Sequence, residues 1–386
     1  MKNLKLCKAL TFIRYFAESL FYPFISLFLS SIGLSVSQIG IIIAAIPITS
    51  ILCAPIYSKL CTNPTKTKRA LMIMSIVETI FILAFVSFSS FVVSLILIIL
   101  ISIVSSSNYG MLDSLLTLSA QECKRQYSSV RIYGSISYML GVLVSGSITA
   151  YISYQGLFYI ACSLFVSVTI LYIFIQPPIH QQEESEKPRL KELFINKSFI
   201  GYLIFYVLFV GSMQVGDDFF SLYMVSKGVE EHLYSYVMFG FIAVEIITMF
   251  ILNKFGKKIG IRLFFLSLIL LLIRFIIQGM EGTPGWLLIA SQMLRGIIWA
   301  SALYLSSTFI SEILGYNLAT SGIILVMLGV QIFNSIFKFC GGYMIERIGF
   351  ASFYLILLGM TGLAFLYFIF YYIQLKKSRK SLGKVL

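Results

Sequence analysis

The chain has 386 residues, of which 59% are hydrophobic and 12% are charged, and its mean hydropathy is +0.93. Soluble domains carry about 25% charged residues, so this composition excludes a soluble protein and indicates one that crosses a membrane many times. The six cysteines form no CxxC pair and no metal-binding spacing, and there are only two histidines. We therefore expect neither a metal site nor a cofactor.

Apolar segments of about 18 residues or more predict the membrane spans. Twelve such segments lie near residues 10–30, 37–58, 70–88, 91–117, 131–151, 157–175, 198–225, 234–252, 262–279, 285–310, 319–343 and 351–373. The expected fold class is an all-α membrane protein of about twelve transmembrane helices.

The loops between these segments alternate in charge. If the N-terminus is cytoplasmic, 23 of the 29 lysines and arginines lie in cytoplasmic loops and tails, and only Lys227 and Arg347 lie outside. This bias predicts a multi-pass protein of the cell membrane with both termini in the cytoplasm. It also accounts for the net charge of +13 without a nucleic-acid partner.

The chain divides into two halves of six spans. Residues 176–197 contain paired prolines and a run of charges, which is typical of a linker. We expect an N-terminal six-helix bundle over 1–175, a cytoplasmic linker over 176–197, and a C-terminal six-helix bundle with a short basic tail over 198–386. FISLFLSSIG (Phe24–Gly33) is similar to FFSLYMVSKG (Phe219–Gly228), and MLGV recurs at 139–142 and 327–330. Internal repeats of six spans are typical of transporters that bind substrate near mid-membrane, where the repeats meet.

The stretch from Asp113 to Tyr138 carries the first functional hypothesis. Asp113 lies near the end of one apolar segment and Arg131 near the start of the next, and Tyr138 follows Arg131 by nearly two helical turns, on the same face. Charges inside a bilayer are costly and are kept for a partner, a pathway or a substrate. Two interpretations stay open: the three side chains grip a small polar solute, or Asp113 and Arg131 form an ion pair that ties two helix ends together.

Other charges also fall within the spans, with nearly equal numbers of each sign. Mutual pairing is therefore expected, because an unpaired ion in a low dielectric is unfavourable. The acids are Glu18, Glu78, Asp217, Asp218 and Glu245, and the bases are Arg14, Arg274, Arg295 and Lys338.

Some of these charges have a more specific expectation. Arg14 and Glu18 lie four residues apart and are expected to neutralise each other, which leaves Glu78 without an obvious partner. Asp217 and Glu245 are candidates for proton coupling, because a buried carboxylate among cations can shift its proton affinity in either direction. A static charge network is the open alternative.

Several sequence stretches, taken in order, carry a family resemblance. They are YFAESLFYPFISLFLSSIGLSVSQIG in span one, LDSL followed by VRIYGS, AVEIITMFILNKFG in span eight, and IRF and SQMLRG in spans nine and ten. The chain resembles the major facilitator superfamily, and within it the lactose-permease-like and phenylpropionate-permease-like branch.

The resemblance implies a major facilitator fold of two pseudo-symmetric six-helix bundles. It also implies a carboxylate and an arginine, at Asp113 and Arg131, that bind the substrate, and an aromatic ring, at Tyr138, that stacks on it. The glutamate context of Glu245 resembles that of branch members, which makes Glu245 the first coupling candidate and Asp217 the second. Further candidate substrate-binding residues are Tyr22, Asp217 and Arg295.

Three features depart from the family pattern. The loop over 58–71 lacks the usual Asp-Arg motif, so the conformational latch normally made there is not expected. Arg295 and Ile298 stand where branch members carry a histidine and a glutamate, so the coupling chemistry of the lactose permease does not transfer. The fifth span has no proline, which counts against a drug/proton antiporter.

No phosphate-binding GxxxxGK[ST] loop is present, so an ion gradient must supply the energy unless the protein is a uniporter. We expect a secondary active transporter, not an enzyme, that takes up a small organic solute with protons by alternating access. The solute classes considered are a sugar or oligosaccharide, a nucleoside, and an aromatic or other organic acid. Export of a drug or metabolite is the alternative function. The expected partners are the substrate, protons and the lipid bilayer, around a monomer.

Overall fold

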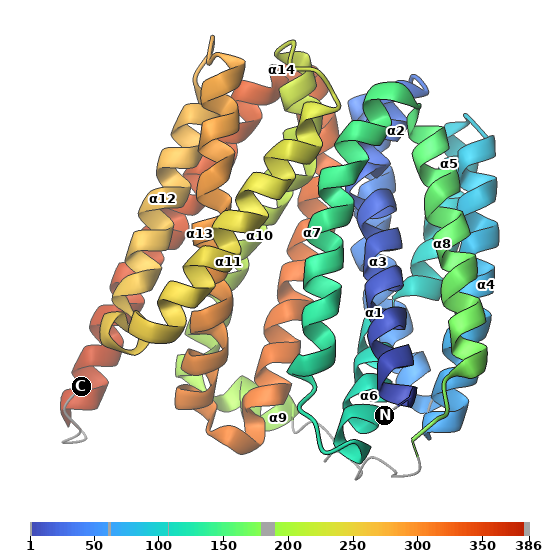
Figure 1. The fold of residues 1–386 in the computed structure, drawn as a ribbon. Coiled ribbons are helices and arrows are strands. Elements are labelled where there is room, and N and C mark those ends of the chain that lie inside the picture. The colour runs from blue at the N-terminus through green and yellow to red at the C-terminus, as the bar shows by residue number, and fades with distance from the viewer. Residues whose placement is uncertain (1, 61–62, 107, 179–189, 382–386) are drawn as a thin grey trace. The chain divides into compact units, whose positions relative to one another are not determined.

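The computed structural model describes residues 2–60, 63–106, 108–178 and 190–381. Within these ranges all regular elements are helical and no strand is present (Figure 1). The elements are α1 (Lys2–Phe21), the 3-10 turn η1 (Tyr22–Phe24), α2 (Ile25–Ser31), α3 (Val36–Leu60), α4 (Pro64–Ser87), α5 (Phe91–Ser105), α6 (Asn108–Glu122), α7 (Ser128–Tyr151), α8 (Tyr154–Phe174), α9 (Leu190–Ile195), α10 (Lys197–Ser226), α11 (Leu233–Ile259), α12 (Arg262–Gly279), α13 (Gly285–Leu314) and α14 (Tyr316–Ser381). The all-α fold class is confirmed.

Eleven helical stretches in the described ranges are long and apolar enough to cross a membrane. The last of these lies in α14, and it contains Gly349 with φ 79° and ψ 166°. Glycine adopts such a conformation because it has no Cβ to clash. The element is therefore two helices joined at Gly349, between the predicted spans 319–343 and 351–373. With this division, the helices account for the twelve predicted spans.

Two predicted spans are interrupted. The first is broken by η1, whose Pro23 lies in its first turn and cannot continue the α-helical hydrogen bonding of α1. The fourth was expected as one helix over 91–117, but α5 ends at Ser105 and α6 begins at Asn108. The Ser106 hydroxyl donates to the carbonyl of Ile103 at 3.0 Å, and serines that bond the backbone in this way favour helix ends. As a result, Asp113 lies on a separate helix, α6.

The ends of the helices follow from local chemistry. Asn63 and Asn196 cap α4 and α10, with side-chain oxygens that accept from the backbone N–H three residues on, at 2.8 and 3.0 Å. The two similar segments found in the sequence end alike: Gly33 follows α2 with φ 87°, and Gly228 follows α10 with φ 77°. Each glycine thus provides the left-handed residue that often terminates a helix.

The chain forms two compact units. Unit 1 consists of Met1–Ser185 with Glu230–Phe239, and unit 2 consists of Glu186–Val229 with Gly240–Leu386. The first residues of α11 therefore group with unit 1, although they follow the predicted linker. Half of that linker, residues 179–189, lies outside the described residues.

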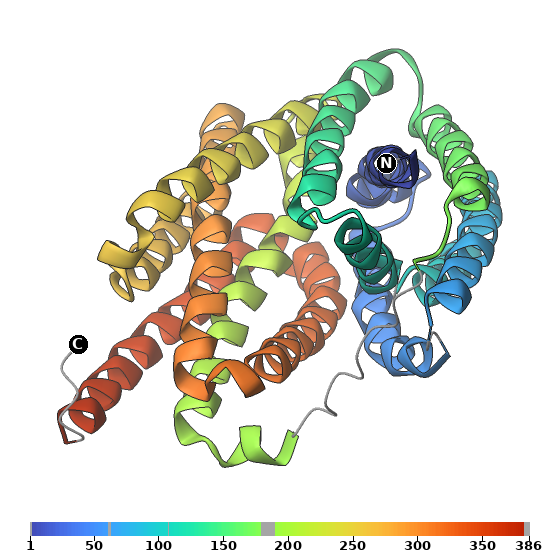
Figure 2. The same ribbon diagram turned by 60° about the horizontal axis from the view of Figure 1, so that its bottom comes forward.

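Unit 1 is built around α1. This helix packs against α6, α7 and α8, and it lies inside the bundle when viewed along its axis (Figure 2). Phenylalanine rings fill the space between α1, α2, α4 and α8: Phe21 and Phe28 each contact both Phe85 and Phe158, at centroid distances of 4.8 to 6.0 Å. These rings are fully buried and contribute the large apolar area that holds such helices together.

Unit 2 is built around α10, which packs against α13 and α14, and α12 packs on both of these. Its core is also aromatic: Phe205 lies 4.4 Å from Phe368 and 5.2 Å from Phe264 between ring centroids. Large apolar side chains such as Leu52, Phe250 and Phe370 are exposed on the surfaces of the two units. A water-soluble protein would bury such side chains, whereas a lipid-facing surface requires them.

Candidate functional site

A buried charge cluster in unit 1 centres on Arg14. Its Nε donates to Glu18 Oε1 at 2.6 Å, and its two terminal nitrogens donate to the two oxygens of Glu78 at 2.7 and 3.1 Å. Glu78 also accepts from the Tyr22 hydroxyl at 2.9 Å and from Asn108 Nδ2 at 3.2 Å. The expectation that Glu78 lacks a partner is therefore wrong: four donors hold its carboxylate. The side chains of the three charged residues are at most 4% exposed.

The helical period explains how α1 builds this cluster. Arg14 and Glu18 lie one turn apart and Tyr22 follows after another turn, so all three lie on one face of the first span. That face meets α4, which carries Glu78. The planar guanidinium of Arg14 also stacks on the Phe165 ring of α8, 4.7 Å from its centroid.

The predicted substrate residues Asp113 and Arg131 have separate partners. Asp113 Oδ1 accepts a 2.5 Å hydrogen bond from the Tyr127 hydroxyl, in the turn before α7. Burial, followed by this hydrogen bond, raises the pKa of Tyr127 above its ordinary range, so the phenol keeps its proton and donates at neutral pH. Among the residues that the structure describes, Asp113 and Arg131 do not form an ion pair. The alternative of a bridge between the two helix ends is thus absent in this conformation.

Arg131 instead stacks on an aromatic ring. Its guanidinium carbon lies 4.2 Å from the centroid of Tyr15, a cation–π contact. Gly134 permits this approach, because a Cβ there would lie 2.7 Å from both Arg131 Nη1 and Tyr15 Cδ2. Tyr138 is half-buried and packs against the hydrophobic cluster that contains Tyr15. Arg131 and Tyr138 of α7 therefore both lie against the hydrophobic cluster that contains Tyr15.

Unit 2 has its own charge cluster, centred on Asp217 of α10. Its Oδ1 accepts from Arg274 Nη2 at 2.6 Å, and its Oδ2 accepts from Arg295 Nε at 2.6 Å. Gln292 bonds both Asp217 and Arg274: its amide nitrogen, Nε2, donates to Asp217 Oδ1 at 3.2 Å, and its Oε1 accepts from Arg274 Nη2 at 2.8 Å. The guanidinium of Arg295 also covers the Phe241 ring at 4.1 Å.

Two further polar contacts join α10 to α14 near this cluster. Gln214 Oε1 accepts from Asn334 Nδ2 at 2.5 Å. The neighbouring Asp218 pairs with Lys338 of α14 at 2.8 Å. The nearly equal numbers of positive and negative charges in the spans thus reflect actual pairs, in agreement with the low-dielectric argument.

Glu245 of α11 differs from the other intramembrane acids. It is half-buried, and within the described part of the chain it has no hydrogen bond or ion pair, although Arg295 is close enough to act on it electrostatically. Gly296 of α13 brings the two helices together here, because a Cβ at this position would collide with the Phe241 carbonyl and the Glu245 amide.

Sequence reasoning missed four residues that complete these clusters. Tyr15 and Asn108 belong to the unit 1 region, Tyr127 holds Asp113, and Gln292 belongs to the unit 2 cluster. Gln292 alone had a usable signal, because it lies three residues before Arg295 on the same face of α13. The other three had none, because their partners come from other elements: Asp113 for Tyr127, Arg131 for Tyr15 and Glu78 for Asn108.

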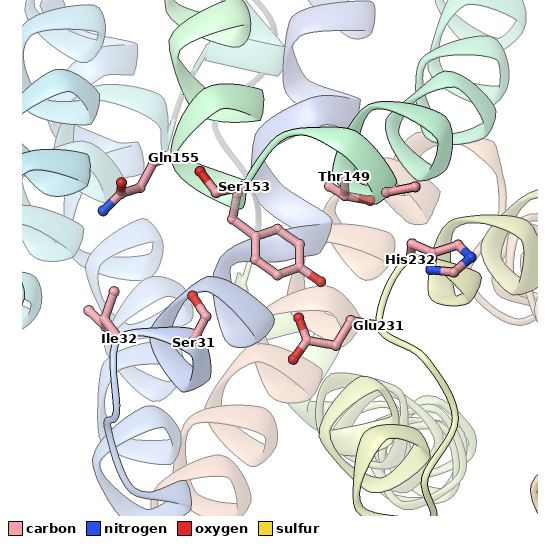
Figure 3. Close-up of a pocket in the computed structure, with 9 residues that line it drawn as sticks. Ser31, Ile32, Thr149, Ser153, Gln155, Glu231 and His232 are labelled. Carbon is pink, nitrogen blue, oxygen red and sulfur yellow. The ribbon is translucent and has the colours of Figure 1, made fainter.

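Unit 1 also has an open pocket of about 500 Å³, away from these clusters. Its lining comes from the end of α2, the turn between α7 and α8, and the residues before α11 (Figure 3). Glu231 extends toward its centre, whereas His232 lies at its margin, 3.2 Å from Glu230. None of the sequence-predicted site residues lines this pocket.

Comparison with known proteins identifies relatives over most of the chain. The sequence profile of the MFS_1 like family matches residues 4–356. The "Uncharacterized transporter YwbF" of Bacillus subtilis is 22% identical over 339 residues, which are 87% of this chain and 84% of the relative. The "Probable 3-phenylpropionic acid transporter" of Escherichia coli is 21% identical over 283 residues, or 72% of this chain and 74% of the relative. The family and these relatives are transporters, not enzymes.

Solved structures share the fold. The nucleoside transporter NupG superposes with a TM-score of 0.83 at 16% identity, over 96% of this chain and 99% of that chain. A POT family transporter in complex with 5-aminolevulinic acid has a TM-score of 0.74 at 14% identity, over 98% and 96%. At such identities the likeness establishes the fold alone.

Proposed function

Since the chain belongs to the MFS_1 like family and is a membrane transporter of the major facilitator type, we propose that it takes up a small organic solute together with protons. The solute crosses by alternating access, driven by the proton gradient. We propose that both termini lie in the cytoplasm, because the loops on that side carry most of the lysines and arginines. We propose further that the solute is an organic acid, in preference to a sugar or a nucleoside.

Arg131 is the observation that carries this choice of solute. It is half-buried in a membrane-spanning helix, and among the described residues its contact is a ring rather than a carboxylate. A guanidinium without an anionic partner in a low-dielectric region is unfavourable until an anion arrives. A carboxylate on the solute would form the paired, charge-assisted hydrogen bonds that this planar group favours.

The surroundings of Arg131 suit an acid with an apolar body. Tyr15 and Tyr138 offer aromatic faces beside the guanidinium, and Asp113, held by Tyr127, can accept from a hydroxyl group of the solute. In unit 2 the proposed substrate contacts are Arg295 and Asp217, and Tyr22 is a further candidate in unit 1. The name of the Escherichia coli relative, which refers to an aromatic acid, supports testing that class first.

Proton coupling is assigned first to Glu245. Asp217 is fixed by two arginines, so its protonation would break two ion pairs of 2.6 Å. Protonation of Glu245 breaks no such contact among the described residues and removes a negative charge that acts on Arg295. A proton on Glu245 would therefore change the field at a proposed substrate contact, which is what coupling requires.

Thermal stabilisation by a panel of candidate solutes tests the substrate class. The purified protein is given phenyl-substituted carboxylic acids, the matching amides and alcohols, sugars and nucleosides, and thermal stabilisation is measured. The proposal expects stabilisation by the acids but not by their neutral amides, and loss of the effect in Arg131→Lys, because a point charge does not reproduce the guanidinium fork. Equal stabilisation by an acid and its amide would contradict it.

A further inference from the structure

The buried charges of unit 1 do not balance. The cluster contains two carboxylates, Glu18 and Glu78, but a single guanidinium, that of Arg14. All three side chains are shielded from solvent by α1, α4, α6 and α8. An extra negative charge without a partner in such a place costs several kcal/mol, of the order quoted for an uncompensated buried ion.

Two oxygen atoms of this cluster also lack hydrogen-bond donors. Glu18 Oε2 and Asn108 Oδ1 are buried and make no hydrogen bond of good geometry to any residue in the described part of the chain. The Tyr109 hydroxyl of α6 lies beside the Glu18 carboxylate. Buried polar atoms in folded proteins nearly always have a partner, so these two oxygens point to a ligand that donates hydrogen or carries positive charge.

We propose that the Glu18–Glu78 pair binds one proton, held on Oε2 of Glu18. The proton comes from water, and its uptake converts the Glu18 carboxylate into a neutral acid with an O–H that Tyr109 can accept. We place the proton on Glu18 because four donors already hold the two oxygens of Glu78, whereas Arg14 holds Oε1 of Glu18 and leaves Oε2 beside the Tyr109 hydroxyl. With the proton bound, the cluster is neutral.

The other titratable groups around the pair leave this balance unchanged. The facing phenols and the thiol are neutral at physiological pH, and the second arginine is separated from Glu18 by a tyrosine ring. These groups are Tyr15 on α1, Tyr22 on η1, Tyr109 on α6, Cys162 and Tyr172 on α8, and Arg131 on α7.

A chain of contacts joins the proton site to the proposed substrate residue. The Tyr109 ring lies 5.8 Å from that of Tyr15, and Tyr15 lies beneath Arg131 at 4.2 Å. Tyr109 is 45% exposed, so it also connects Glu18 with the surface of unit 1. An anion bound at Arg131 would therefore change proton binding at Glu18 through the contacts of the Tyr15 and Tyr109 rings. This role in coupling rests on the proposed function, whereas proton binding itself does not.

Infrared spectroscopy of the purified, full-length protein tests proton binding directly. We expect the carboxylic-acid C=O band to be present at neutral pH, to be lost in Glu18→Gln, to shift in Tyr109→Phe, and to be unchanged in the control Glu230→Gln, an exposed acid of unit 1. Glu78→Gln is the second variant: with one carboxylate and one guanidinium left, Glu18 should ionise and the band should disappear. A band that survives both glutamate variants, or no band at neutral pH, would overturn the proposal.

Three further outcomes identify the bound cation and separate this inference from the proposed function. A band that is absent in sodium buffer but present in choline buffer would mean that the site takes a monovalent metal cation, which overturns the assignment of a proton. If the band behaves as expected but a pH gradient fails to drive uptake in proteoliposomes, the proton site stands and the coupled-uptake function fails. If uptake is proton-driven but the band is insensitive to Glu18→Gln, the coupled-uptake function stands and the proton site at Glu18 fails.

Discussion

Replacement of Asp217 by asparagine should be among the most damaging single changes in unit 2. Asp217 is 14% exposed and neutralises two guanidinium groups at 2.6 Å, those of Arg274 and Arg295. Removing one partner from a buried ion pair costs about 3–5 kcal/mol, because the remaining charge stays out of water. Arg274 is fully buried and keeps, among the described residues, only the neutral oxygens of Gln292 and of the new asparagine as acceptors, whereas Arg295 can turn toward Glu245, so we expect a loss of about 3–4 kcal/mol.

The neighbouring residue provides a matched control. Asp218 is 36% exposed and pairs with Lys338 alone, at 2.8 Å. Solvent screens such a pair, so Asp218→Asn should cost about 1 kcal/mol or less. The two variants make the same chemical change one residue apart on α10, and they differ in the burial and number of the ion pairs that are lost.

Unfolding by denaturant in detergent, followed by tryptophan fluorescence, measures both losses. The two tryptophans of the chain, Trp286 and Trp299, lie on α13 in unit 2, so the signal reports the affected unit. Adding Arg274→Gln to Asp217→Asn should recover part of the lost stability, because it removes the buried charge left alone. Equal losses for Asp217→Asn and Asp218→Asn would refute the reasoning.

The remaining predictions concern transport and topology. Glu245→Gln should abolish accumulation of solute against a gradient yet leave counterflow exchange, measured with labelled solute in proteoliposomes; retained accumulation would move the coupling role elsewhere. Tyr138→Phe should keep most of the binding, while Tyr138→Ala should weaken it by about 1–3 kcal/mol in a binding titration, the magnitude of losing a buried ring; no loss would remove the ring from the site. Reporter fusions after Ser153 and Gln176 should report opposite sides of the membrane, and a shared side would contradict the topology.

The spans were predictable because their signal is local. A bilayer sets the length of an apolar helix, and the positions of Gly33 and Gly228 mark where helices end. The two breaks that were missed are the 3-10 turn at Pro23, inside the first predicted span, and the break between α5 and α6, where the Ser106 hydroxyl bonds the backbone. Neither one interrupts the apolar composition on which the prediction of spans relies.

The partners of charged residues were less predictable, because they depend on tertiary contacts. Arg14 and Glu18 were paired from their spacing on one helix, but Glu78 joins them from α4, 64 residues away from Arg14. The pairing of Asp113 with Tyr127 depends on the turn before α7, which hydrophobic periodicity does not describe. Charge balance correctly indicated that partners exist, without indicating which ones.

Uptake into proteoliposomes under an imposed pH gradient tests the central claim of proton-coupled transport most directly. The account predicts that a labelled aromatic acid accumulates above its external concentration when the interior is alkaline. Accumulation should stop when a protonophore collapses the gradient, while exchange of solute across the membrane continues. The same final level of solute with and without the gradient, or accumulation only when the gradient is reversed, would contradict proton-coupled uptake.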